Sequence, residues 1–333
     1  MEIVTDYLVI GSGIAGLSFA LHAAKAGTVA VVTKKEKAEG STNYAQGGIA
    51  SVFDRDDSFE LHIKDTLESG DGLCHEDIAR IVVEEGPARV QELISMGVQF
   101  TRRGETQDVL DLGREGGHSK RRIVHTKDLT GREVERILLD RAAEDKNIQI
   151  YENHMAIDLI TKSKLIRRGI IRSERSETCW GAYVLDVDQS EIITFLARIT
   201  VMSTGGAGKV YRYTSNPDIA TGDGVAIGYR AGAKVANMEF VQFHPTCLYH
   251  PEAKNFLISE AVRGEGGILR LKNGDRFMKK YHEKMELAPR RVYGIFWQDD
   301  MLQDMLFLLN FLPSGLLHTL FLISPIQVTL LWG

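Results

Sequence analysis

The stretch Asp6-Tyr7-Leu8-Val9-Ile10-Gly11-Ser12-Gly13-Ile14-Ala15-Gly16 decides the fold. Its apolar run predicts a buried parallel strand, and the glycines follow at G-x-G-x-x-G spacing. A helical stripe of small and apolar residues (17–24) and a second apolar run (29–32) complete a βαβ pattern. In this pattern the glycines allow a tight turn, let the backbone approach a pyrophosphate and let the helix pack closely on the strand. We therefore expect an α/β protein with a Rossmann-like, dinucleotide-binding domain; an ordinary glycine-rich turn is the alternative.

The end of the second predicted strand departs from the usual dinucleotide pattern. Thr33-Lys34-Lys35 stands where an acidic residue would hold the ribose, so Lys34 is expected to face the nucleotide instead. The loop Ser41-Thr42-Asn43-Tyr44-Ala45-Gln46-Gly47-Gly48 follows. Its small residues, amides and glycines suit a loop that wraps a large flat ligand with backbone donors, and a solvated loop is the alternative.

Composition narrows the classes of protein. The 333 residues carry a formal net charge of -5, which argues against a nucleic-acid partner. Cys74, Cys179 and Cys247 share no pair spacing, so no disulfide framework is predicted and a reducing cytoplasm fits best. The N-terminus has no signal-peptide pattern, and we expect no membrane span in the first 290 residues.

The middle of the chain begins with helical periodicity. Two helices are predicted over residues 58–69 and 76–97, with Pro87 early in a helix or at a break. A charged stretch at residues 102–127 has three interpretations: a nucleic-acid patch, a solvated loop, or a cationic pocket for a small dianion. Interleaved acids and the lack of stacking aromatics disfavour the nucleic-acid patch. An amphipathic helix is predicted over residues 132–143.

From residue 148 the pattern changes to strands. Alternating runs at residues 148–151, 181–187 and 192–201 predict an antiparallel meander. Thr221-Gly222-Asp223-Gly224 then opens a predicted helix over residues 225–231. Asp223 at its start either caps the helix, holds a ligand hydroxyl or helps to order a cofactor loop.

The segment around His244 contains residue types that can bind a metal ion. His244, Cys247 and His250 have ligand-like spacing, but no second cluster accompanies them, so no metal is predicted. A catalytic or anion-binding His244 is expected, with a plain loop histidine as the alternative. A polar, glycine-rich segment (259–267) follows, and Glu286-Leu287-Ala288-Pro289-Arg290 is the last ordered signal.

Together these motifs resemble the flavoprotein family that contains L-aspartate oxidase and the flavoprotein subunits of succinate dehydrogenase and fumarate reductase. The matching segments are DYLVIGSGIAGL, TNYAQGGIA, REGGHSKRRIVH with TGREVE, STGGAG, ATGDGVAIGYRAGA, EFVQFHPT, SEAVRGEGG and ELAPR, in family order over about residues 5–290. REGGHSKRRIVH favours the L-aspartate oxidase branch. Ser41 stands where the respiratory subunits carry a histidine that attaches FAD covalently, so the resemblance implies non-covalent FAD.

The resemblance also implies roles for individual residues. FAD would be held by Gly11, Ser12, Gly13, Ile14, Ala15, Gly16, Lys34, the 41–48 loop and Asp223. Arg290 would be the catalytic proton donor or acceptor, although an arginine is a poor base. His244 and Ser259 would contact a substrate carboxylate, and Glu115 would orient the ammonium group of L-aspartate.

The implied reaction turns L-aspartate into iminoaspartate for quinolinate and NAD synthesis. Oxygen or fumarate would accept the electrons, and quinolinate synthase is a candidate partner. A fumarate reductase-like flavoprotein with an iron–sulfur partner is one alternative. A non-catalytic remnant that binds part of FAD, or nothing, is another.

Residues 291–333 do not continue the resemblance. No Asp, Glu, Lys or Arg occurs from Met305 to Gly333, and prolines interrupt the apolar runs. A frameshifted or misjoined translation is the preferred interpretation, with a membrane anchor or a genuine alternative end as rivals. The predicted domains are thus 1–236 (FAD binding), 237–290 (incomplete capping domain) and 291–333 (non-family tail). We expect the chain as written not to oxidise L-aspartate at a useful rate.

Overall fold

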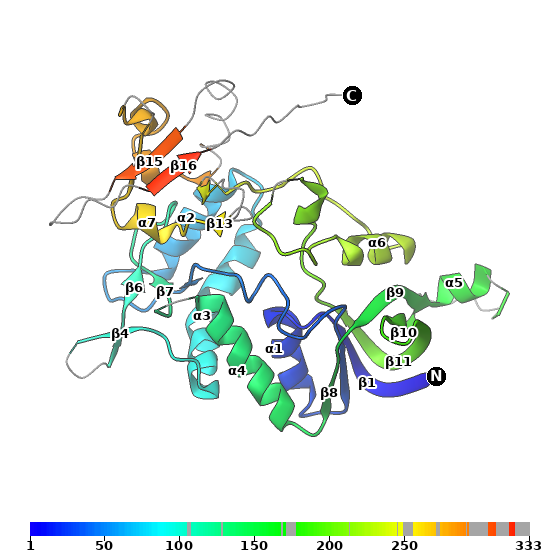
Figure 1. Cartoon of the computed structure of the whole chain (residues 1–333). Coiled ribbons are helices and arrows are strands. Elements are labelled where there is room, and N and C mark those ends of the chain that lie inside the picture. Colours follow the sequence, from blue (N-terminus) through cyan, green and yellow to red (C-terminus); the bar gives the residue numbers. More distant parts are fainter. Residues whose placement is uncertain are drawn as a thin grey trace. The chain divides into compact units, whose positions relative to one another are not determined.

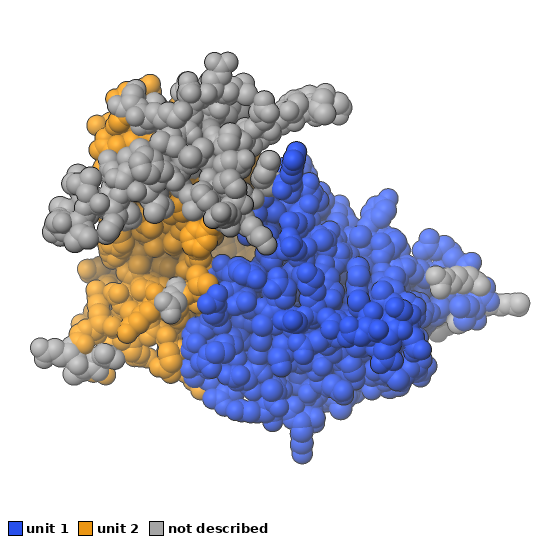
Figure 2. Space-filling view, viewed as in Figure 1, with its two compact units in different colours: residues 1–45, 96–98, 131–239 blue, residues 46–95, 99–130, 240–333 orange. Residues whose placement is uncertain are grey.

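The computed structural model of the chain contains two compact units, coloured separately in Figure 2. Unit 1 comprises residues 1–45, 96–98 and 131–239, and unit 2 comprises residues 46–95, 99–130 and 240–333. The structure describes residues 1–104, 108–127, 129–167, 169–170, 178–212, 214–244, 246–248, 256–270, 274–290, 292, 306–310 and 320–323. The predicted domain boundary at residue 236 stays a prediction.

Unit 1 is built on a mixed sheet. Its strands are β1 (Glu2–Ile10), β2 (Val29–Val32), β8 (Ile148–Tyr151), β9 (His154–Thr161), β10 (Cys179–Asp186) and β11 (Glu191–Met202). Their order is β8-β2-β1-β11-β10-β9 (Figure 1). The first four are parallel, and β10 is antiparallel to both of its neighbours. A parallel sheet of this kind needs cover on both faces.

The strand β1 is apolar on both sides, and a helix covers each face of the sheet there. Val9 packs with Ala20 and Ala23 of α1 (Ile14–Ala23) on one face. Leu8 packs on the other face in a cluster that includes Ile227 of α6 (Asp223–Arg230). The remaining helical segments of unit 1 are α4 (Thr130–Glu144), α5 (Lys162–Arg167) and η1 (Gly208–Val210).

The predicted antiparallel meander is partly wrong. Residues 148–151 form β8, which lies parallel to β2 rather than in the meander. The reason is topological, since α4 precedes β8 and a helical crossover joins parallel strands. The meander consists instead of β9, which the pattern did not predict, with β10 and β11.

Unit 2 begins with two helices close to their predicted bounds. Ser58 starts α2 (Phe59–Gly70) by accepting a hydrogen bond from the N–H of Leu61 at 3.2 Å. In α3 (Glu76–Met96) the prediction for Pro87 is wrong, because the helix continues through it. A proline inside a helix costs about 3 kcal/mol. The buried side chains of Val83 and Val90 on either side offset this cost by packing.

Short strands and short helical segments make up the rest of unit 2. Those before residue 130 are β3 (Ile49–Ala50), β4 (Arg102–Arg103), β5 (Val109–Leu110), β6 (Leu112–Gly113) and β7 (Ile123–Val124), with β3-β7-β6 in one sheet. Those after it are β12 (Cys247–Leu248), β13 (Phe256–Leu257), β14 (Ile268–Arg270), β15 (Leu306–Asn310) and β16 (Leu320–Ile323). The helical segments there are α7 (Ala261–Gly264), η2 (Phe277–Lys280) and η3 (Met285–Leu287).

The predicted tail, residues 291–333, lies largely outside the described residues. Of its described parts, β15 pairs antiparallel with β14 and β16 pairs antiparallel with β15. Among the described residues, no helix combines the length and apolar character that crossing a membrane requires.

Candidate functional site

The glycine turn between β1 and α1 is built for close approach. Gly11 has a φ of 113°, and a Cβ there would lie 2.3 Å from the carbonyl oxygen of Ser203. A Cβ on Gly16 would lie 2.0 Å from the carbonyl oxygen of Gly11. Neither position accepts a side chain, so the start of α1 packs directly against the strand ends. This is the geometry in which a helix N-terminus holds a pyrophosphate.

Lys34 takes part in an ion pair at the same edge of the sheet. Its Nζ lies 2.5 Å from Oδ2 of Asp223 and donates to Oγ1 of Thr221 at 2.6 Å. Burial raises the pKa of Asp223, but its hydrogen bonds to Lys34 and Thr221 outweigh burial and lower it. In the structure Lys34 is thus paired with a carboxylate from the start of α6, far along the chain.

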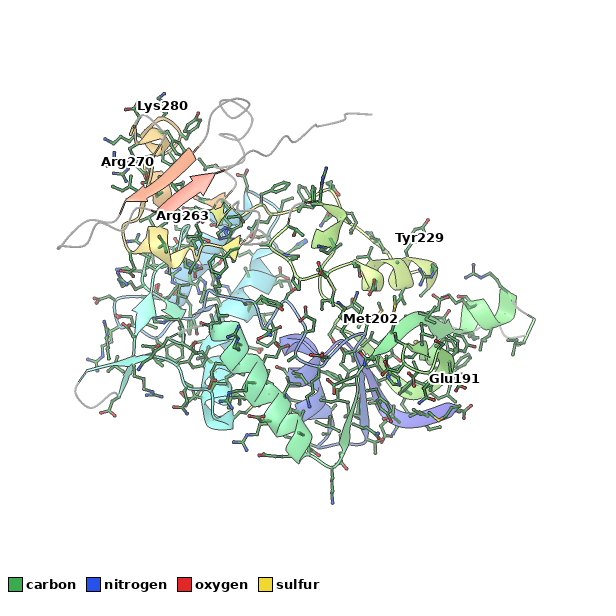
Figure 3. All side chains as sticks on the ribbon, viewed as in Figure 1. Glu191, Met202, Tyr229, Arg263, Arg270 and Lys280 are labelled. Atoms are coloured by element: carbon green, nitrogen blue, oxygen red, sulfur yellow. The ribbon has the colours of Figure 1, made fainter. Side chains whose placement is uncertain are left out.

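A cleft of about 350 Å³ in unit 1 collects most of the predicted cofactor residues. Those that line it are Gly11, Ser12, Gly13, Ile14, Ala15, Lys34, Ser41, Thr42 and Asp223. The end of β11 contributes Met202, labelled in Figure 3. The glycine cradle and the exposed backbone fit the pyrophosphate of a dinucleotide, and the roles of the single residues stay predictions.

The 41–48 loop is divided between the two units. In unit 1, Oγ1 of Thr42 accepts a hydrogen bond from the N–H of Ile14 at 3.1 Å, at the N-terminus of α1. Asn43, Tyr44 and Ala45 also belong to unit 1 but do not line the cleft. Gln46, Gly47 and Gly48 belong to unit 2.

Unit 2 contains a chain of guanidinium and carboxylate groups around the buried Glu260 and Arg263. Arg290 donates from Nε and Nη2 to Oε2 of Glu260, at 2.8 and 2.5 Å. Arg263, labelled in Figure 3, lies 3.0 Å from Oε1 of the same carboxylate. Arg290 also donates from Nη1 to Oε1 of Gln242 at 2.8 Å. Glu260 is nearly fully buried, so its charge depends on these two arginines.

Glu115 is the second carboxylate in this cluster. Burial and the negative charge of Glu260 raise its pKa, and Arg290 and Arg263 oppose that rise. For Glu260 itself, burial raises the pKa but Arg263 and Arg290 outweigh it and lower it. The pKa values of these two neighbouring carboxylates are thereby shifted in opposite directions, and that of Glu115 is the higher.

His244 and Ser259 belong to unit 2 as well. Nδ1 of His244 accepts a hydrogen bond from the N–H of Thr246 at 3.2 Å, which leaves the ring proton on Nε2. Burial and then Arg290 lower the pKa of His244 to about 4, so the ring is neutral at pH 7. Oγ of Ser259 accepts from the N–H of Ala261 at 3.3 Å.

Sequence reasoning missed the residues that join these groups. In the sequence, Glu260 and Arg263 stand out only as part of a polar segment, and no motif marks Gln242. The one signal available in the sequence was the spacing of three residues between Glu260 and Arg263, because at the start of a helix this spacing lets the two side chains meet.

The described part of the charged stretch at residues 102–127 is partly exposed and partly buried, so the solvated-loop interpretation holds for part of it and the cationic-pocket interpretation stays a prediction. Arg122 within it is fully buried between Asp57 and Asp65. Arg121 is half-exposed and pairs with Glu265. These two arginines are therefore paired within the protein.

No metal site can be built from the described side chains, since no group of three or more histidine, cysteine or acidic residues gathers among them. His250 lies outside the described residues.

Comparison with known proteins agrees with this geometry. The family described as FAD binding domain matches residues 6–301. The chain is 52% identical over 287 residues to L-aspartate oxidase 1 of Ralstonia nicotianae, covering 86% of the chain and 52% of that protein. It is 51% identical over 292 residues to L-aspartate oxidase of Pseudomonas aeruginosa, covering 86% and 53%. The chain thus spans about half the length of the curated relatives it matches, and the predicted resemblance is confirmed.

Solved structures show the same fold. A mutant of E. coli quinol fumarate reductase FrdA superposes with a TM-score of 0.83 and 29% identity, covering 95% of this chain and 55% of that one. A quinol-fumarate reductase with menaquinol molecules gives 0.80 and 29%, covering 93% and 55%. These matches confirm the predicted α/β fold with a Rossmann-like domain. The chain therefore belongs to the FAD binding domain family, with FAD as its cofactor.

Proposed function

We propose that the chain carries the cofactor site and substrate-binding groups of an L-aspartate oxidase, which converts L-aspartate into iminoaspartate. The observation that carries the proposal is Glu115 beside the Arg290–Glu260–Arg263 cluster in unit 2. A dicarboxylate needs cationic partners, whereas an amine needs an anionic one. Succinate has no amine, so a fumarate reductase-like function leaves Glu115 without a ligand partner.

FAD, when bound, supplies the hydride acceptor. The protein groups hold the substrate and manage its protons. His244 offers a neutral Nε2–H and Ser259 a hydroxyl to a substrate carboxylate, while Glu115 orients the ammonium. Arg290 is the proposed proton donor or acceptor, and its contact with Glu260 gives a proton a carboxylate within hydrogen-bond reach.

Further parts of the proposal concern the cellular setting. Oxygen or fumarate accepts the electrons, and the fold shared with fumarate reductases supports fumarate. Quinolinate synthase is proposed as a partner because it consumes the product. A cytoplasmic location is supported by the three free cysteines, Cys74, Cys179 and Cys247.

Replacing Glu115 by Gln tests the substrate. Losing one charge-assisted hydrogen bond costs about 1.5–3 kcal/mol, so L-aspartate should bind about 10- to 100-fold more weakly. Succinate, which lacks the amine, should bind as before. Dissociation constants come from the change in flavin absorption of the FAD-loaded chain. An equal loss for both ligands would contradict the ammonium contact.

Two further measurements separate the alternatives. Acid precipitation should release yellow FAD into the supernatant because Ser41 cannot form a histidyl link; flavin that stays with the pellet would contradict this. An L-aspartate-induced spectral change without hydrogen peroxide is the result expected from the FAD-loaded chain. L-aspartate-dependent hydrogen peroxide would support the oxidase and contradict the expectation that this chain does not turn over at a useful rate. FAD binding with neither peroxide nor an L-aspartate-induced spectral change would favour the non-catalytic remnant.

A further inference from the structure

The loop that carries Glu115 is attached through the exposed Ser119 to three buried ions, Arg122, Asp57 and Asp65. We call these four residues the Arg122 cluster. Arg122 is fully buried and donates from Nε and Nη2 to both oxygens of Asp57 at 2.8 Å. Its Nη1 donates to Oδ2 of Asp65 at 2.6 Å. One guanidinium thus faces two buried carboxylates, and its own charge cannot balance both.

Ser119 supplies two further hydrogen-bond donors to Asp65. Its backbone N–H and its Oγ both donate to Oδ2 of Asp65, each at 2.8 Å. These donors come from the end of the Glu115 loop, which we define as residues 113–119. Asp65 is satisfied only while the loop stays in place, and moving it would leave a buried carboxylate short of partners.

The other contacts of the Glu115 loop leave it little freedom. The N–H of Arg122 donates to the carbonyl oxygen of Gly113 at 3.1 Å, at the other end of the loop. Between these ends, the N–H of Gly117 donates to the carbonyl oxygen of Leu287 at 3.2 Å. A Cβ on Gly116 would lie 2.6 Å from Oε1 of Glu260, so the loop backbone lies directly against that carboxylate.

We infer that Arg122, with Asp57, Asp65 and Ser119, is a positioning unit that sets the place of the Glu115 carboxylate and thereby the selectivity for an amine-bearing dicarboxylate. Because Arg122 is fully buried, it acts through the Glu115 loop and not on a ligand directly. The selectivity part rests on the proposed function. The positioning part does not, because it concerns the loop alone.

Ser119 gives the cleanest test, since replacing Arg122 would leave two buried carboxylates and threaten folding. In the FAD-loaded chain, Ser119→Ala should weaken L-aspartate about tenfold and succinate less than about twofold. Ser119→Thr restores the hydroxyl and should keep both affinities. Arg121→Gln is the matched control, because it breaks a neighbouring but half-exposed bidentate pair with Glu265. It should leave the ratio of the two affinities unchanged.

Hydrogen exchange of backbone amides in residues 113–119 gives a second readout that needs no substrate. Ser119→Ala should speed this exchange about tenfold, and Arg121→Gln should not. Unchanged exchange, or an equal loss for L-aspartate and succinate, would overturn the inference. If exchange speeds up but the unsubstituted chain does not prefer L-aspartate, the positioning part stands. The proposed function, and the selectivity part with it, would then fall.

Discussion

The cofactor cleft of unit 1 and the ionic cluster of unit 2 are built in opposite ways. In the cleft, the turn from Gly11 to Gly16 is one continuous stretch. It can be this tight because both glycines lack a Cβ, for which there is no room. In the cluster, Glu115, Glu260 and Arg290 come from distant parts of the chain, and their state follows from burial and mutual charge. The first site depends on local sterics and the second on electrostatics, so they should fail differently when changed.

The largest effect is expected from steric damage to the cleft. Gly16→Val places a side chain where a Cβ would already lie 2.0 Å from the carbonyl oxygen of Gly11. Overpacking of this kind costs about 3 kcal/mol or more, so FAD should bind at least about 100-fold more weakly. Titration of flavin fluorescence measures this. Gly228→Ala is the control, because its Cβ would only reach ordinary contact at 3.8 Å. Normal FAD affinity in Gly16→Val would contradict the steric account.

A comparable but purely electrostatic effect is expected in the cluster. Glu260→Gln removes the charge between Arg263 and Arg290, and breaking a buried pair costs about 3 kcal/mol. Urea unfolding should show that loss, and the pKa of Glu115 should fall because a neighbouring negative charge has gone. Glu265→Gln, whose carboxylate is half-exposed, should cost at most about 1 kcal/mol. Equal losses in the two variants would show that burial is irrelevant here.

The smallest effect concerns a buried acid in unit 1 and depends on pH. Glu135 lies on α4 with no hydrogen-bond partner for either carboxyl oxygen among the described residues. Burial, and then the charge of Glu39, raise its pKa from 4.5 to about 8. The folded state therefore holds a proton that the unfolded state releases. The resulting stability is complete below about pH 4.5 and is lost as the pH rises through about 8.

Glu135→Gln should remove that pH dependence. Between pH 5 and pH 8 the free energy of unfolding of the unsubstituted chain should fall by an amount on the order of 2 kcal/mol more than that of the variant. Denaturant unfolding at both pH values measures the difference. Asp140→Asn, on the exposed side of the same helix, is the control and should leave the slope unchanged. A slope that persists in Glu135→Gln would assign it to another group.

The sequence by itself predicted the βαβ unit on which unit 1 is built, namely β1, α1 and β2. Glycine spacing, apolar runs and helical stripes are local signals, and they predicted α1 and β2 within a few residues, whereas β1 begins at Glu2, well before the apolar run Tyr7–Ile10. The same rules placed α2, α3 and α4 within a few residues. They failed for β8, because alternation does not reveal which strand becomes a neighbour. They also failed for Pro87, because the packing that outweighs its cost is not local.

Only the tertiary structure decided which charged side chains form ion pairs. Lys34 was expected to face a nucleotide, and the fold pairs it with Asp223. Arg122 stood in a stretch open to three interpretations, and the fold buries it between two carboxylates. No sequence motif assigned a role to Glu260, yet its carboxylate pairs with both Arg263 and Arg290. The physical reason is that the energy of a charged group depends on its distances to other charges and on its exclusion from water. Both are set only when the chain has folded.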